Sequence, residues 1–352
     1  MRLRRAQPPL AMPELQGVGF GQAAAELRSR VKTVALLVTV AAISASGTAL
    51  ARRYALARQL VDVPGERRSH SVATPRGGGV GPVVAVLAAM LAMTAAQGTP
   101  WLAAIALAAV ALVGAWDDHR PLAASWRLLV HAAAGLAVAG SLFDPMVAPL
   151  LFAAVFAGVV VLINVWNFMD GINGLAASQA ALVAAAVAAV DPGMRIPAIV
   201  VVVACLAFLP FNFPRARIFL GDVGSGALGL IVAWLCAGVA TARPLNGLLM
   251  ALPLSAFLVD AGLTLSRRML RRERWWEPHA QHLYQGLARR HGHARVTLAY
   301  AAWTASASVA SLVIAPMGPA YTMASLAVCY TSAALLWLRL QRPVATERDA
   351  SS

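Results

Sequence analysis

Acidic residues are few in this sequence, and several of them adjoin long apolar runs. The chain has 352 residues, of which 15 are Asp or Glu. Asp117 and Asp118 end one apolar run, while Asp170 and Asp222 each lie in a glycine-containing segment beside another. An ionisable residue at the edge of a membrane-spanning segment is costly unless it is paired, so it marks a candidate functional site. Helix capping or pairing with an arginine is the structural alternative for each of these aspartates.

The four aspartates and two nearby asparagines suggest divalent-cation chemistry. Asn164 and Asn167 precede Asp170 in the segment 164–176, NVWNFMDGINGLA. Carboxylate and amide oxygens suit Mg²⁺, with Mn²⁺ as an alternative, and Mg²⁺ commonly completes its shell with water and substrate phosphates. Glycines around Asp170 and Asp222 would let the backbone approach a phosphate group closely.

A basic, glycine-rich loop near residue 70 fits a further phosphate contact. Arg67, His70 and Arg76 lie there, and three glycines at 77–79 follow Arg76 directly. Guanidinium groups and exposed backbone N–H groups are suited to a diphosphate. The structural alternative is simple flexibility, which is common in glycine-rich segments.

Four of the seven histidines lie in the last large loop. His279 and His282 are three residues apart, so they would share one face if the segment is helical. We expect these two residues to contact phosphate or uracil. Zinc ligation is the alternative, although no cysteine is near and acids are few. For His291 and His293, a solvated loop with incidental histidines is the structural alternative.

The elements that must position these residues are predicted from composition. Hydrophobic residues make up 59% of the chain and charged residues 12%, against about 45–50% and about 25% in soluble domains. This composition excludes a disordered chain, a coiled coil and an ordinary soluble enzyme. It predicts an all-α integral membrane protein with about eleven spanning helices, each near 20 apolar residues. The expected spans are 31–50, 80–97, 100–116, 126–142, 148–165, 174–190, 195–211, 225–241, 246–265, 296–315 and 320–340.

The loops between these spans alternate between two kinds. One set is short and nearly uncharged, and the other is mostly rich in arginine; the turn at 164–174 belongs to the second set by position. The positive-inside rule assigns the arginine-rich set to the cytoplasm, with the N-terminus outside and the C-terminus inside. Basic residues in the first 32 positions favour the opposite orientation, but the later loops outweigh them. The net charge of +14 therefore indicates orientation rather than nucleic-acid binding.

This pattern divides the chain into three parts. Residues 1–30 form a polar N-terminal segment, 31–340 a single polytopic membrane domain with the catalytic residues, and 341–352 a cytoplasmic tail. The polar and acidic motifs all belong to the cytoplasmic side of the middle part.

At these residues the sequence resembles the polyprenyl-phosphate N-acetylhexosamine-1-phosphate transferases, of the glycosyltransferase family 4 type. Five segments carry the resemblance, and they occur in the family's order across most of residues 62–295. They are RSHSVATPRGGG at 68–79, DDHRPL at 117–122, NVWNFMDGINGLA at 164–176, FLGDVGSGALG at 219–229, and the histidine motif at 279–285.

The resemblance implies an activity and a set of partners. Bacterial members transfer a phospho-sugar from a UDP-sugar to undecaprenyl phosphate and release UMP, as the first step of lipid-linked polysaccharide synthesis. It implies a multi-pass protein of the bacterial inner membrane whose active site faces the cytoplasm and which acts with Mg²⁺. The expected partners are a UDP-N-acetylhexosamine, undecaprenyl phosphate and the bilayer, with no nucleic acid, and a homodimer stays an open alternative.

The resemblance also implies roles for individual residues. Asp117 and Asp118 match adjacent aspartates implicated in catalysis or in binding the lipid phosphate. Asp222 matches the aspartate that binds Mg²⁺. Asn164, Asn167 and Asp170 match the family's nucleotide-sugar and active-site segment. His279 and His282 match its cytoplasmic histidine loop.

Two departures from the family pattern refine the expected donor. Asn173 stands where many members have Asp, so we assign it no catalytic role. The histidine loop lacks the run of three histidines found in members that build the peptidoglycan lipid precursor. This favours the branch that initiates O-antigen or other envelope polysaccharides, with UDP-GlcNAc or a derivative as donor.

Two alternatives remain open at this point. One is the phospho-N-acetylmuramoyl-pentapeptide transferase of peptidoglycan synthesis, within the same family. The other is a membrane transporter, which would place its polar residues near the middle of the bilayer between two related halves. A direct transfer and a two-step route through a covalent carboxylate intermediate both use the same residues.

Overall fold

The computed structural model describes residues 17–62, 72–97, 101–274, 277 and 279–341. These residues form thirteen helices and one two-stranded antiparallel sheet, in which Val61 pairs with Pro75. The strands are β1 (Val61–Asp62) and β2 (Thr74–Pro75). The helices are α1 (Gly17–Ala57), α2 (Val80–Gln97), α3 (Trp101–His119), α4 (Ala124–Leu142), α5 (Pro149–Met169), α6 (Leu175–Val190), α7 (Arg195–Asn212), α8 (Asp222–Ala242), α9 (Pro244–Leu249), α10 (Ala251–Leu270), α11 (Leu283–His291), α12 (His293–Ile314) and α13 (Pro319–Leu340).

Ten of the eleven predicted apolar segments each coincide with or lie within one long helix, and the segment 246–265 covers part of α9 and most of α10. Eight helices in the described part of the chain are long and apolar enough to cross a membrane, namely α1, α3, α4, α5, α7, α8, α12 and α13. Of the other three, α2 and α6 are apolar but shorter, and α10 contains Asp260, Arg267 and Arg268. The prediction of an all-α membrane protein is confirmed, and the count of eleven spans stays a prediction.

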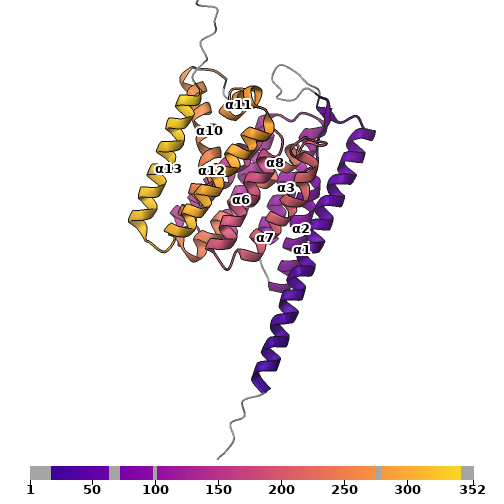
Figure 1. Cartoon of the computed structure of the whole chain (residues 1–352), viewed down its shortest axis with the longest axis vertical. Coiled ribbons are helices and arrows are strands. Elements are labelled where there is room, and N and C mark those ends of the chain that lie inside the picture. The colour runs from indigo at the N-terminus through magenta and orange to yellow at the C-terminus, as the bar shows by residue number, and fades with distance from the viewer. Residues whose placement is uncertain (1–16, 63–71, 98–100, 275–276, 278, 342–352) are drawn as a thin grey trace, which may run out of the picture.

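The first helix is longer than its predicted span. α1 has 41 residues, which corresponds to about 60 Å at 1.5 Å per residue, roughly twice the thickness of the hydrocarbon core. Its N-terminal part extends beyond the rest of the bundle, whereas the C-terminal end of α13 lies at the other end (Figure 1). The predicted boundary at residue 30 therefore falls inside a continuous helix.

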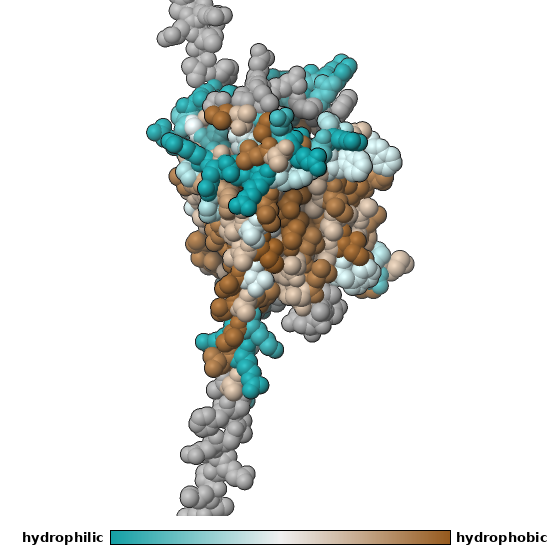
Figure 2. Space-filling model, turned by 90° about the vertical axis from the view of Figure 1, so that its right-hand side faces the viewer, coloured by the Kyte–Doolittle hydropathy of each residue, from teal (hydrophilic) through white to brown (hydrophobic). Residues whose placement is uncertain are grey.

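The outer surface is apolar over the middle of the molecule. Figure 2 shows a broad hydrophobic band bounded by hydrophilic residues at the end where α1 finishes. Large apolar side chains such as Leu112, Leu129 and Leu336 are exposed on the outer surface of the helices. A soluble protein rarely exposes so large a contiguous apolar surface, so this band is the expected contact with lipid tails.

α8 is the central helix of the bundle. Within it, 94% of the residues of the candidate span are buried, and it packs against α3, α5 and α6. Its close contact with α5 depends on a small residue, because a Cβ atom on Gly229 would collide with the backbone at Leu162 and Ile163. The N-terminus of α8, which begins with Asp222, is thereby fixed against the C-terminal ends of α3 and α5.

Candidate active site

One arginine joins two of the predicted aspartates. Arg127 lies in the first turn of α4, and its Nη1 atom is 2.9 Å from Asp117 Oδ2 and 3.8 Å from Asp222 Oδ2. Asp117 Oδ1 also accepts from the backbone N–H of Leu122 at 2.5 Å. Asp117 is at the end of α3 and Asp222 at the start of α8. Residues about a hundred positions apart in the sequence therefore form one charged cluster.

Asn167 extends this cluster to α5. Its Nδ2 atom donates to Asp222 Oδ1 at 2.9 Å and to Ser225 Oγ at 3.2 Å. Asp222 keeps a side chain that is 36% exposed. The Asp222 carboxylate is thus oriented by an amide and an arginine while it remains accessible to a ligand.

Asp118 faces a different partner from Asp117. Its Oδ1 atom accepts from the backbone N–H of Asp222 at 3.2 Å, and its Oδ2 atom accepts from that of Val223 at 3.1 Å. The side chain is buried, and Arg76 donates to the backbone carbonyl of Asp118. Asp118 thus supplies acceptors and a negative charge to the first N–H groups of α8, which stabilises that helix start.

Glycines make the close approach of these segments feasible. Gly221 has φ +76°, and a Cβ atom there would lie 2.7 Å from Asp118 Oδ2. A Cβ atom on Gly79 would collide with the Cα atom of Gly224, and one on Gly114 with the backbone of Asp222. These glycines therefore bring α3, α8 and the loop after β2 together, and the predicted close approach to a phosphate stays a prediction.

Asp170 adds a fourth carboxyl group at the end of α5. It follows the last helical residue, Met169, and its carboxylate makes no hydrogen bond within the described part of the chain. Burial raises the pKa of Asp170 well above its usual range, and the nearby Asp222 and Asp118 raise it further. A site that gathers this many carboxyl groups is stabilised when a cation is bound.

The residues present fit a magnesium ion that relies on its substrate for ligands. Within the described residues, no three His, Cys, Asp or Glu side chains converge closely enough to hold a metal ion alone. Mg²⁺ usually binds proteins through one or two carboxylates and takes its other ligands from water and substrate phosphates. Asp222, which is partly exposed and lies next to Asp117, has the chemistry of such a ligand.

The histidine motif lies against the segment that contains Asp170. Tyr284 is fully buried and donates from its hydroxyl group to the carbonyl oxygen of Phe168 at 2.9 Å. The His282 ring stacks on the Phe168 ring with centroids 6.1 Å apart, and the His279 ring is 4.9 Å from that of His282. These contacts place His279 beside the end of α5.

The segment that contains the two histidines is not helical, so the condition for a shared helical face is not met. His282 is the residue before α11, with φ −62° and ψ 145°, so His279 and His282 precede the helix. Buried Asp260 of α10 explains this start, because it accepts the N–H groups of Leu283 at 2.8 Å and Tyr284 at 3.0 Å. The two rings are nonetheless neighbours, through the extended backbone instead of through helical spacing.

His279 is neutral near physiological pH. Burial lowers the pKa of His279 to about 4, and the adjacent His282 and Arg268 contribute in the same direction. A neutral imidazole can donate or accept a hydrogen bond but carries no charge. This favours hydrogen bonding to a uracil or phosphate oxygen over an ion pair.

The structure brings most of the predicted residues to one end of the bundle. Asp117, Asp118, Asp222 and Asn167 interact directly or through Arg127, with Arg76 at Asp118. Asn164 lies one helical turn from Asn167 and contacts His131 at 3.4 Å and the carbonyl of Val160 at 2.7 Å. Predicted residues Arg67 and His70 lie outside the described residues.

Four important residues were missed by sequence reasoning. Asn173, to which the sequence assigned no catalytic role, is not one of them; its amide donates to the carbonyl oxygen of Pro214 at 3.0 Å. Arg127 and His131 carried one usable signal, since a spacing of four places them on the same face of a helix that starts beside Asp117. The missed residues are Arg127, His131, Asp260 and Tyr284.

Aspartates at the ends of α3, α5 and α8 lie together at one end of this helical membrane protein. Residues 100–240 match the model of glycosyl transferase family 4.

Curated relatives are similar to this chain over about three quarters of its length. The chain is 29% identical over 319 residues to the decaprenyl-phosphate N-acetylglucosaminephosphotransferase of Mycobacterium leprae (strain TN), covering 76% of this chain and 79% of the relative. It is 28% identical over 281 residues to the probable undecaprenyl-phosphate N-acetylglucosaminyl 1-phosphate transferase of Bacillus subtilis (strain 168), covering 74% and 77%. A phospho-N-acetylmuramoyl-pentapeptide-transferase of Synechococcus sp. (strain JA-3-3Ab) is 45% identical, but over 20% of this chain and 22% of the relative.

Proposed function

We propose that this protein transfers N-acetylhexosamine 1-phosphate from a UDP-sugar to a polyprenyl phosphate and releases UMP. UDP-GlcNAc or a derivative is the proposed donor, and undecaprenyl phosphate the proposed acceptor. The reaction is the first step in the synthesis of a lipid-linked polysaccharide. The site formed by Asp117, Arg127, Asn167 and Asp222 is the observation that carries this proposal.

The breadth of each match favours this donor. Relatives named for N-acetylglucosamine phosphate transfer match over about three quarters of both chains. The relative named for the peptidoglycan precursor matches over a fifth of this chain. The polar cluster is at helix ends and not midway along the bundle, which also disfavours the transporter alternative.

Asp222 is the proposed magnesium ligand. Bound Mg²⁺ would neutralise charge on the UDP diphosphate and on the departing UMP. Asn167 orients the Asp222 carboxylate through its 2.9 Å hydrogen bond. Arg127, between Asp117 and Asp222, is placed to contact a phosphate group once these carboxylates bind the cation.

The transfer step exchanges one phosphorus–oxygen bond for another. An oxygen of the lipid phosphate forms a bond to the β-phosphorus of the UDP-sugar. The bond from that phosphorus to the bridging oxygen breaks, and UMP leaves with the electron pair. Asp117 is the residue proposed to position or deprotonate the lipid phosphate, and Asp118 holds the start of α8 in place beside it.

The location of the cluster suits a lipid acceptor. Asp117 and Asp222 are at the ends of helices that qualify as membrane spans. A polyprenyl phosphate can therefore enter from the bilayer with its phosphate at the level of the aspartates. We infer that this end faces the cytoplasm of a bacterial inner membrane, because the arginine-rich loops lie on the same side.

A donor panel tests the proposal. Purified protein is supplied with Mg²⁺, undecaprenyl phosphate and one UDP-sugar at a time, and UMP release is measured. We expect turnover with UDP-GlcNAc or a derivative and none with the UDP-linked muramoyl pentapeptide. Turnover with the pentapeptide donor alone would support the peptidoglycan alternative, and no turnover with any donor would contradict the proposal.

A further inference from the structure

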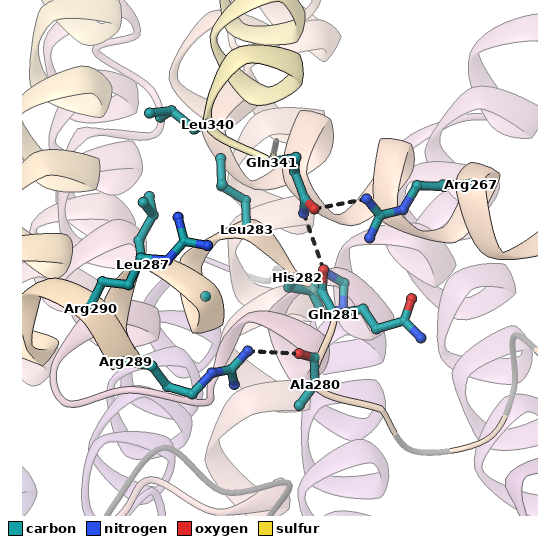
Figure 3. A pocket seen from close by; sticks show the side chains of 11 residues that line it. Arg267, Ala280, Gln281, His282, Leu283, Leu287, Arg289, Arg290, Leu340 and Gln341 are labelled. Carbon is teal, nitrogen blue, oxygen red and sulfur yellow. Dashed lines mark hydrogen bonds between the residues drawn. The ribbon is translucent and has the colours of Figure 1, made fainter. Parts of the chain in front are cut away.

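A second basic site lies beside α11, apart from the aspartates. It is a pocket of about 190 Å³ between the end of α10, the turn before α11, and the end of α13. Its cationic side chains are Arg267, Arg289 and Arg290, and no acidic residue lines it. Figure 3 shows Arg267 on one side and the other two arginines on the opposite side, with Gln341 between them.

The arginines have no carboxylate partner within the described part of the chain. Arg267 donates to Gln341 Oε1 at 2.8 Å and stacks on Trp337, 5.4 Å from the ring centroid, yet its Nε atom is buried without an acceptor. Arg289 donates to the carbonyl of Ala280 at 3.3 Å. Three cations with spare donors indicate an anionic ligand.

The rim of this pocket is apolar. Leu283, Leu287 and Leu340 line it together with the arginines. α13, which forms one wall, is exposed along most of its length, with 11% of its span buried. Leu335, Leu336 and Leu338 on this helix are exposed large apolar residues. A ligand here would therefore meet positive charge at the helix end and apolar surface along α13.

We propose that this arginine pocket binds the phosphate headgroup of an anionic phospholipid whose acyl chains lie along α13. Free phosphate would match the charges but not the apolar wall. The space needed is present, because nothing lies within 4 Å of where a Cβ atom on Gly286 would be. None of the four aspartates lines the pocket, while His282, whose ring stacks on Phe168, is one of its lining residues.

Lipid-dependent thermal unfolding tests this site. Detergent-solubilised protein is titrated with dioleoyl phosphatidylglycerol, and the midpoint of unfolding is followed. The test variant is Arg289→Gln with Arg290→Gln, and the matched control is Arg53→Gln with Arg271→Gln, which removes two exposed arginines outside the pocket. We expect phosphatidylglycerol to raise the midpoint in wild type and control, while the test variant needs about 30-fold more lipid, from about 1 kcal/mol per arginine.

Three further arms separate the sources of phosphate. Dioleoyl phosphatidylcholine and inorganic phosphate should leave the midpoint unchanged. If inorganic phosphate reproduces the arginine-dependent rise, or if undecaprenyl phosphate alone does so, the phospholipid assignment is overturned. Equal lipid requirement in test variant and wild type also overturns it. Should the double variant fail to fold, Arg290→Gln alone, which removes an exposed side chain, is expected to show a roughly fivefold loss.

Discussion

Adjacent aspartates Asp117 and Asp118 have different tasks because they point to different elements. Asp117 pairs with Arg127 of α4, whereas both carboxylate oxygens of Asp118 accept N–H groups at the start of α8. The sequence predicts both as catalytic, since adjacent acids at a helix end look alike. Only the packing of α3 against α8 distinguishes them.

Replacing Asp118 should therefore reduce stability more than replacing Asp117. Asp118→Ala removes the acceptors for two N–H groups of α8, and loss of such a cap costs about 1–2 kcal/mol. We expect the midpoint of thermal unfolding to fall by about 2–4 °C. Asp117→Ala is the matched comparison and should lower the midpoint less. Equal midpoints would contradict the capping role of Asp118.

Replacing Arg127 should lower kcat/KM, whereas replacing the nearby Arg120 should not. Arg127→Gln removes the cation that joins Asp117 and Asp222. A hydrogen bond to a charged group contributes about 1.5–3 kcal/mol, which corresponds to roughly a 10- to 100-fold loss in kcat/KM. Arg120→Gln, an exposed change in the segment between α3 and α4, serves as the control and should retain activity. Wild-type kcat/KM in Arg127→Gln would remove this residue from the site.

At the scale of elements, the apolar helices were predictable and their lateral contacts were not. A spanning helix needs a long apolar run, so hydropathy locates α2 to α8 directly. The continuation of α1 to Gly17 could not be predicted, because a helix that leaves the membrane no longer needs apolar residues. The residue that accepts the first N–H groups of α11 could not be predicted either, because Asp260 lies 23 residues before Leu283, within another helix.

The glycines of the loop after β2 fix a contact between elements, and this can be tested. Gly79→Ala places a methyl group against the backbone of Gly224. Overpacking of this kind costs about 1–3 kcal/mol, so the midpoint of thermal unfolding should fall. Gly262→Ala in α10 is the control, because its Cβ atom meets nothing within 4 Å, and alanine is about 1 kcal/mol better than glycine inside a helix. A stable Gly79→Ala protein would show that the loop can move away.

At the scale of the whole molecule, the site aspartates gather at one end of the bundle and are absent from the opposite end in the described part of the chain. Asp144 and Asp191, at the end opposite the site, each accept a nearby backbone N–H in a turn. All the aspartates assigned to the site lie at the other end. The sequence could indicate this division because loop charge alternates with each crossing of the membrane.

The proposed orientation predicts which turns are accessible from outside the cell. Met146 is 89% exposed in the turn between α4 and α5, and Arg271 is exposed at the site end. In a background with Cys205, Cys236 and Cys329 replaced, Met146→Cys should react with an impermeant maleimide in intact cells, and Arg271→Cys should react only after permeabilisation. The reverse pattern would invert the orientation.

The most direct test of the central claim is UMP release by Asp222→Asn. Asparagine keeps the size of the side chain and removes the charge that would bind the cation. With UDP-GlcNAc, undecaprenyl phosphate and Mg²⁺, the purified variant should release no UMP above the background without Mg²⁺, while its thermal unfolding remains cooperative. Asp144→Asn, at the opposite end of the bundle, should keep wild-type turnover. Full Mg²⁺-dependent UMP release by Asp222→Asn would contradict the account.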